Sequence, residues 1–222
     1  MKQPTFRQVA EAFTLVEVLV VAAVVAILVA LLTPALTDRP RKSPLLYCMN
    51  NLKQVGLALQ MFADDNTNQF PPQVSVTNGG SLELILSNSP ALHFQSLSNY
   101  LGRNWRVFRC PADESKQPLT TNGILTDLNV SFFLSVDAIP KMMNIIHAGD
   151  RNLELAGQAV RPGLYTLTTN VAVRWTRELH TKQVGKQCGN VLFTDGHVET
   201  LRENLSAAVL RQGLATNRLV FP

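Results

Sequence analysis

Four histidines, three cysteines and 16 acidic residues are the side chains with which this chain could perform chemistry. His93, His147, His180 and His197 form no HExxH motif, and the sequence contains no Gly-x-Ser-x-Gly elbow or phosphate-binding loop. Asp195 lies two residues before His197, a spacing that an acid–base pair could use. The simpler interpretation is a turn aspartate followed by an exposed strand histidine. The sequence therefore predicts no catalytic residues and no enzyme.

Acidic residues are also the candidates for binding a metal ion. Asp150, Asp195 and Glu199 could gather around calcium, which takes six to eight oxygen ligands. No DxDxDG-type loop supplies further ligands, so these three residues are weak candidates. No other metal or cofactor is predicted.

The cysteines, Cys48, Cys110 and Cys188, form no CxxC pair, and this spacing disfavours a zinc site. If the domain lies outside the cytoplasm, one disulfide and one free thiol are expected. The sequence alone leaves all three pairings open.

A carboxylate at the start of an apolar run is the most unusual feature of the sequence. Residues 18–37 (VLVVAAVVAILVALLTPALT) carry no charge and would span about 30 Å as a helix. Lys2 and Arg7 precede the run, which is longer than the apolar core of an ordinary secretory signal. A signal anchor or uncleaved transmembrane helix is the plain alternative. Glu17 is costly in such a helix, and a residue of this kind is a functional candidate.

Residues 12–19 (AFTLVEVL) resemble the prepilin processing site of type IV pilins and type II secretion pseudopilins. The resemblance implies that a membrane peptidase cuts between Ala12 and Phe13 and methylates the new amino terminus. It divides the chain into a leader, 1–12, and a transmembrane assembly helix, 13–37. Glu17 and Pro34 then occupy positions where the family commonly has Glu and Pro. Pro34 would also weaken or kink the helix locally.

The same resemblance implies partners and a location. Glu17 would pair in a filament with the amino group of Phe13 on a neighbouring subunit. The expected partners are a prepilin peptidase, other pseudopilin subunits, the inner-membrane assembly platform and the membrane itself. The chain would cross the inner membrane once, place its globular domain outside the cytoplasm, and enter a filament after assembly. Basic residues nearly balance on the two sides of the run, so this orientation follows from the resemblance alone.

A linker at 38–43 is predicted to separate the first helix from the globular domain, 44–222, because Pro40 and Pro44 disfavour helix at the residues before them. Ser43 is the expected N-cap and Pro44 the first residue of a second helix over 44–64. Apolar residues recur along this helix at spacings of four and three, which predicts one buried face: Cys48, Leu52, Val55, Leu59 and Phe62.

Three further segments resemble a pseudopilin-like subgroup common in planctomycetes and verrucomicrobia. They are residues 48–72 (CMNNLKQVGLALQMFADDNTNQFPP), 109–113 (RCPAD) and 189–199 (GNVLFTDGHVE). The subgroup often has a histidine ten residues before its Asp-Gly, whereas His180 precedes Asp195 by fifteen. The middle of the chain, 74–101, matches little.

The C-terminal half is predicted to be rich in β-structure. Residues 130–136 and 143–149 are strand candidates, and 190–194 and 197–201 flank Asp195-Gly196, a hairpin signal whose two residues tolerate positive φ. A short last helix is expected over 203–212, with Gly213 at its end. The predicted fold is α+β and pilin-like: a long N-terminal hydrophobic membrane helix, and a second helix packed on an antiparallel β-sheet.

Three function classes are compatible with these features. The first is a structural subunit of a type II secretion-like or type IV pilus-like filament, which Phe13, Glu17 and Pro34 favour. The second is a membrane-anchored extracytoplasmic module that displays a carbohydrate- or surface-binding domain. The third is an exported enzyme with a pilin-type anchor. A net charge of +4 without clusters of basic and aromatic residues predicts no nucleic-acid partner.

Overall fold

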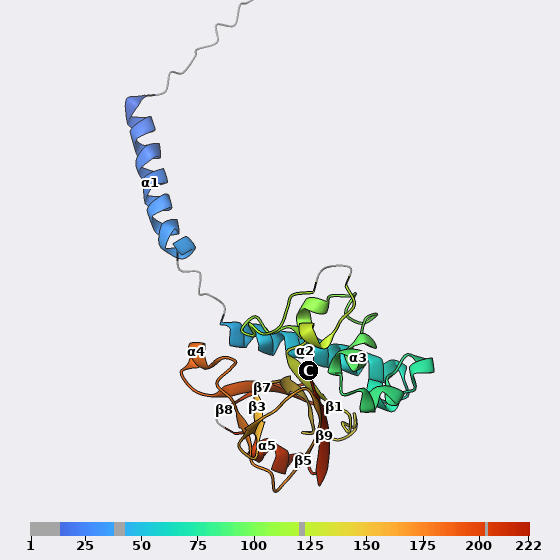
Figure 1. Ribbon diagram of the computed structural model, residues 1–222. Helices are drawn as coiled ribbons and strands as arrows, with labels where there is room; N and C mark the ends of the chain where they lie inside the picture. The colour runs from blue at the N-terminus through green and yellow to red at the C-terminus, as the bar shows by residue number, and fades with distance from the viewer. Residues whose placement is uncertain (1–13, 38–42, 120–122, 203) are drawn as a thin grey trace, which may run out of the picture. The chain divides into compact units, whose positions relative to one another are not determined.

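The computed structural model describes residues 14–37, 43–119, 123–202 and 204–222. The chain divides into two compact units, Met1–Arg41 and Lys42–Pro222 (Figure 1). The predicted processing residues Ala12 and Phe13 and most of the predicted linker lie outside the described residues.

The first unit contains helix α1, Leu15–Thr37, in which Glu17 is the acidic residue of the first turn. Within the described part of the chain, no helix combines the length and the apolar character needed to cross a membrane. The predictions of a transmembrane helix at 13–37 and of a single-pass inner-membrane protein were therefore wrong.

The second unit begins with helix α2, Pro44–Asp65, which confirms the helix predicted over 44–64. Ser43 occupies the N-cap position and Pro44 the first turn, as predicted, although the Ser43 side chain makes no capping hydrogen bond. The predicted apolar face is confirmed, since its five members are buried: Cys48, Leu52, Val55, Leu59 and Phe62.

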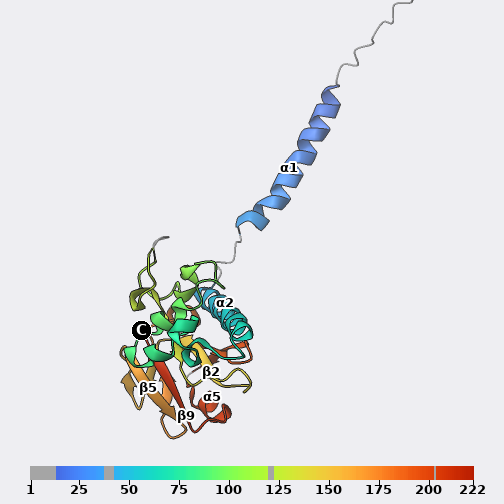
Figure 2. The ribbon, with the colours of Figure 1, turned by 90° about the vertical axis from the view of Figure 1, so that its right-hand side faces the viewer.

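A six-stranded antiparallel sheet forms the centre of this unit, in the order β5-β9-β1-β2-β7-β8. Its strands are β1 (Phe132–Ser135), β2 (Ile146–Asp150), β5 (Gly163–Thr168), β7 (Cys188–Phe193), β8 (Val198–Arg202) and β9 (Thr216–Phe221). Strand β9 pairs with β5 on one side and β1 on the other, so the last strand of the chain lies inside the sheet. Helix α2 packs on β7 and runs alongside the sheet (Figures 1 and 2).

A second, three-stranded sheet has the order β4-β3-β6, from Gln158–Ala159, Leu153–Leu155 and Val173–Trp175. The short helices are α3 (Pro90–Gln95), α4 (Thr181–Val184) and α5 (Ser206–Arg211), and 3₁₀ turns cover Pro71–Gln73, Val76–Asn78, Leu82–Ser87, Trp105–Phe108 and Asp127–Asn129. This arrangement, richer in sheet than expected, corrects the pilin-like prediction of a long membrane helix and one helix on one sheet. The chain instead builds two sheets, because segments without a clear sequence pattern form the additional strands β3, β4, β5 and β6.

The core lies on both faces of the central sheet, because neighbouring strand residues point to opposite sides. Phe132 and Leu134 belong to the cluster that contains the buried face of α2. Phe133 belongs to the other cluster, together with Trp175 of the second sheet and Val209 of α5. The three central strands β1, β2 and β7 are consequently buried along their whole length.

The hairpin predicted around Asp195-Gly196 is confirmed, since β7 and β8 pair antiparallel with Leu192 opposite Val198. The turn differs from the one expected: Gly196 has a φ of 87°, whereas Asp195 is not among the residues with positive φ. Gly196 N donates to Phe193 O at 2.9 Å, closing a turn that ends on the glycine. Such a turn needs positive φ only at its last residue.

Candidate functional site

The N-terminal candidate Glu17 is part of a capping box. Its carboxylate Oε2 accepts hydrogen bonds from Thr14 N and Thr14 Oγ1, both at 2.8 Å, and its own backbone N–H donates to Thr14 Oγ1 at 3.3 Å. These reciprocal bonds satisfy backbone donors that a helix start leaves free. They also lower the pKa of Glu17. The sequence analysis missed this role, although Thr-x-x-Glu before an apolar run is its signature.

The other assembly candidate, Pro34, lies within α1, and the helix continues past it to Thr37. Its side chain lies outside the described part of the structure. The processing residues Ala12 and Phe13 stay predictions.

The three calcium candidates contact different residues. Asp150 is buried at the end of β2, whereas Asp195 contacts His197 in the hairpin turn and Glu199 pairs with Arg211. Among the described residues, the one group of possible ligands whose atoms lie close enough together includes Asp150 but neither Asp195 nor Glu199. The imidazole of His197 also stacks on Phe193, with the ring centroids 4.4 Å apart.

The cysteines form one disulfide, between Cys48 of α2 and Cys110 just after the 3₁₀ turn Trp105–Phe108. Cys188, the first residue of β7, is a buried free thiol. Burial, with a further contribution from the charge of Asp150, raises its pKa. This is the arrangement of one disulfide and one thiol that the sequence allowed without fixing the pair.

Asp150 and His180 form a buried pair beside this disulfide. Asp150 Oδ2 lies 3.1 Å from His180 Nε2 and accepts a hydrogen bond from Asn190 N at 2.6 Å. His180 Nε2 is also 3.7 Å from Cys110 Sγ. His180 occupies the position before α4 with a φ of 61°, a backbone conformation that is uncommon for a residue with a side chain. Such strain persists only where the surroundings enforce it.

A cavity of about 300 Å³ lies next to His180, which is one of the residues that line it. Arg151 lines this cavity, and its guanidinium binds Asp113 and Glu178. Asp113 belongs to the RCPAD segment, and Pro111 and Ala112 of the same segment also line the cavity. This segment therefore contributes one sulfur to the disulfide and three residues to the cavity.

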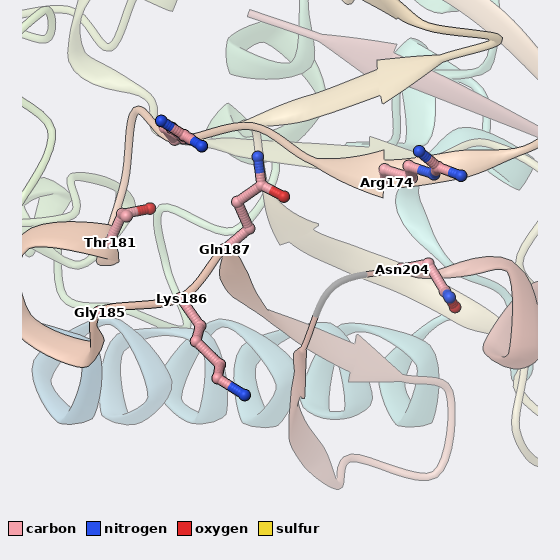
Figure 3. Close-up of a pocket in the computed structure, with 7 residues that line it drawn as sticks. Arg174, Thr181, Gly185, Lys186, Gln187 and Asn204 are labelled. Atoms are coloured by element: carbon pink, nitrogen blue, oxygen red, sulfur yellow. The ribbon is translucent and has the colours of Figure 1, made fainter.

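A second, basic cavity of about 710 Å³ lies at the end of the small sheet (Figure 3). It is lined by Arg174, Arg177, Thr181, Gly185, Lys186, Gln187 and Asn204. Arg174 lies on β6 and is bridged to Asn204, whereas Lys186 and Gln187 lie on the segment that leads into β7. Among the described residues, no acidic side chain forms an ion pair with Arg174, Arg177 or Lys186. No sequence pattern indicates this cavity, because its cations are separated along the chain.

Comparison of the chain with protein-family models, with curated proteins and with solved structures finds no match. Function is therefore inferred from the residues of the chain and their contacts.

Proposed function

We propose that this chain is a structural subunit of a filament of the type II secretion or type IV pilus kind, cleaved before Phe13 by a prepilin peptidase. The observation that carries the proposal is helix α1, an apolar helix whose described residues include a single charge, Glu17. The resemblance of residues 12–19 to a prepilin processing site supports the same function.

The apolar surface of α1 needs a partner. Every described side chain from 14 to 31 is exposed, including Leu15 at 76%, Ile27 at 60% and Leu31 at 69%. Large exposed apolar surfaces mark sites of association, because removing them from water is favourable. Identical helices packed side by side in a filament would bury this surface. When each subunit contacts the next through two different patches and the ring does not close, the repeated contact produces a helical array.

Glu17 gives such an array a defined register. Its carboxylate caps its own helix through Thr14, and capping leaves its negative charge without a cation within the described part of α1. The amino group that cleavage creates at Phe13 of a neighbouring subunit would supply that cation. Capping needs the hydrogen-bonding shape of the side chain, whereas pairing between subunits needs its charge.

These two roles can be separated by matched variants in the native host. Glu17→Gln keeps a side chain that can complete the capping box and removes the charge, whereas Thr14→Ala removes the box and keeps the charge. We expect Glu17→Gln to be cleaved normally, by intact mass, and to be lost from sheared filaments. Thr14→Ala should retain filament content. Normal filament content with Glu17→Gln, or an uncleaved chain in the wild type, would contradict the proposal.

A second candidate function is a binding module for an anionic saccharide, and the basic cavity favours it. Three cations line a cavity that also offers hydroxyl and amide groups from Thr181, Gln187 and Asn204, and no acidic side chain in the described part of the chain forms an ion pair with them. The lining contains no aromatic ring, so the cavity suits a sulfated or carboxylated ligand better than a neutral sugar that would stack.

Calorimetric titration of the full chain with a sulfated disaccharide and with its neutral parent tests this function. We expect binding of the sulfated compound alone, weakening as salt is added. Arg174→Gln should weaken it at least tenfold, whereas Arg161→Gln, an exposed arginine outside the cavity, should not change it. Equal effects of the two substitutions, or equal binding of the neutral sugar, would exclude the site.

A further inference from the structure

The group formed by Cys48, Cys110, Asp150 and His180 has the composition of a metal site. Each residue offers one ligand atom, all four residues are buried, and the four atoms lie within 4.8 Å of one another. They come from α2, the RCPAD segment, the end of β2 and the start of α4, so four separate parts of the fold converge here. Two sulfurs, an imidazole and a carboxylate are ligands that zinc accepts in four-coordinate sites.

Two spacings among the ligand atoms are close to those around a tetrahedral ion. With bonds of about 2.3 Å to sulfur and about 2.0–2.1 Å to nitrogen and oxygen, such an ion separates a sulfur from a nitrogen by about 3.6 Å and a nitrogen from an oxygen by about 3.3 Å. The observed separations are 3.7 Å from Cys110 Sγ to His180 Nε2 and 3.1 Å from His180 Nε2 to Asp150 Oδ2. Two of the six separations among the four ligand atoms are therefore close to those of such an ion, whereas the two bonded sulfurs would have to move apart.

Two buried polar atoms of the group lack hydrogen-bond partners in the described part of the chain: Asp150 Oδ1 and His180 Nδ1. They are not the candidate ligand atoms, Asp150 Oδ2 and His180 Nε2, but they show that this buried group is only partly satisfied by the protein, which is uncommon for buried polar atoms. Asn190 N fixes the Asp150 carboxylate from the neighbouring strand, as groups behind metal ligands commonly do. His180 also lines the cavity of about 300 Å³, although its side chain and that of Asp150 are fully buried.

The disulfide decides whether the site exists. In the disulfide form the sulfurs of Cys48 and Cys110 are bonded to each other at 2.03 Å, and they are poor ligands. A dithiol reductant would transfer two electrons and two protons to this bond, become a disulfide itself, and leave two thiols. A divalent ion would then displace the two thiol protons as it binds the thiolates.

We propose that the dithiol form of this group binds a zinc-like divalent ion through Cys48, Cys110, Asp150 and His180. Helix α2 and the RCPAD segment are then linked either by the disulfide or by the metal ion, according to the redox conditions. A zinc site was disfavoured by the lack of a CxxC pair, but the fold brings together ligands that are distant in sequence.

Cobalt(II) titration of the full chain, reduced with a phosphine, tests the proposal. We expect one equivalent of cobalt to give the visible bands of a tetrahedral ion and a thiolate-to-cobalt charge-transfer band, which zinc then abolishes. The oxidised chain should show neither. Zinc should raise the melting temperature of the reduced chain, and a chelator should reverse the rise. If the reduced chain unfolds without metal, zinc should restore its near-ultraviolet circular dichroism.

His180→Gln separates this site from adventitious thiol binding. Its folding is first checked in the oxidised state, where the disulfide is present, and after reduction it should bind cobalt at least tenfold more weakly than the wild type. Cys188→Ser, which removes the buried cysteine outside the group, should keep the full spectrum. Reduced chain without a thiolate-to-cobalt band, or His180→Gln with the affinity of the wild type, would overturn the proposal.

Discussion

Arg151 binds both carboxylate oxygens of Asp113: its Nε donates to Oδ2 at 2.8 Å and its Nη2 to Oδ1 at 3.0 Å. Burial by itself raises the pKa of Asp113, but hydrogen bonds from Arg151 and Ser115 and the charge of Arg151 outweigh burial and lower it. The folded-state pKa is thus below the unfolded one. The pair therefore stabilises the fold above about pH 4, and this stabilisation is lost as the pH falls further.

Asp113→Asn should lower the free energy of unfolding at pH 7 by roughly 1.5–3 kcal/mol, because hydrogen bonds between charged groups are lost in a buried setting. Glu178→Gln is the matched control, since Glu178 binds the same arginine but is 52% exposed. An exposed pair contributes about 1 kcal/mol or less. Urea unfolding measures both variants. Equal losses in the free energy of unfolding would show that the Asp113–Arg151 pair contributes no more to stability than the exposed Glu178–Arg151 pair.

His147 should make the fold sensitive to mild acid. It is fully buried, and burial lowers its pKa to about 3. The unfolded chain binds a proton near pH 6.5 that the folded chain refuses, so stability falls as the pH decreases from about 6.5 to about 3. The slope for one such group is at most about 1.4 kcal/mol per pH unit.

His147→Leu should remove that contribution, so its free energy of unfolding should fall less steeply than that of the wild type between pH 6.5 and pH 4. Parallel pH profiles for the two proteins would contradict the assignment. His93, whose pKa burial lowers to about 4, is expected to keep part of the acid sensitivity in this variant.

Gly196→Val should destabilise the domain by roughly 1–3 kcal/mol, because valine is strained at positive φ. A Cβ at this position would meet nothing within 4 Å, so the effect comes from the backbone alone. Asn tolerates this conformation, and Gly196→Asn should cost distinctly less. Thermal unfolding of the two variants tests this difference. Identical melting temperatures would mean that the turn changes its backbone conformation and so avoids the strain.

Removing the disulfide should cost about 4 kcal/mol in the chain-entropy model, since its cysteines are separated by 62 residues. The variant to compare is Cys48→Ala/Cys110→Ala, in the presence of a chelator. The reduced wild type should then approach the stability of this variant. A difference of less than about 1 kcal/mol between oxidised wild type and variant would show that other contacts already hold α2 in place.

Features with a regular local pattern were predictable from the sequence. The spacing from Cys48 to Phe62 located α2 and its buried face, and Asp195-Gly196 located a hairpin. The capping box of Thr14 and Glu17 has an equally local signature, Thr-x-x-Glu, but it was not predicted. The membrane-helix prediction rested on the charge-free run 18–37, but no helix in the described part of the chain is long and apolar enough to cross a membrane. The pilin-like prediction did not foresee the second sheet, whose strands are short and have no clear sequence pattern.

The candidate site depended on contacts that no local pattern records. Asp150 and His180 lie thirty residues apart, and each needs β2, β7 and α4 in place before the two side chains meet. The choice of Cys48 and Cys110 among three pairings is likewise set by the position of α2 against the RCPAD segment. Tertiary packing, and not residue spacing, determines these relations.

The position of β9 fixes when the domain can become stable. Both β1 and β5 bond to this strand, whose first residue is Thr216, so β5 cannot join the sheet until β9 has been synthesised. A growing polypeptide therefore cannot complete its fold piece by piece from the amino end. Strands β1, β2, β7 and β8 can pair before β9 is present, whereas β5 has no neighbour in the central sheet until then.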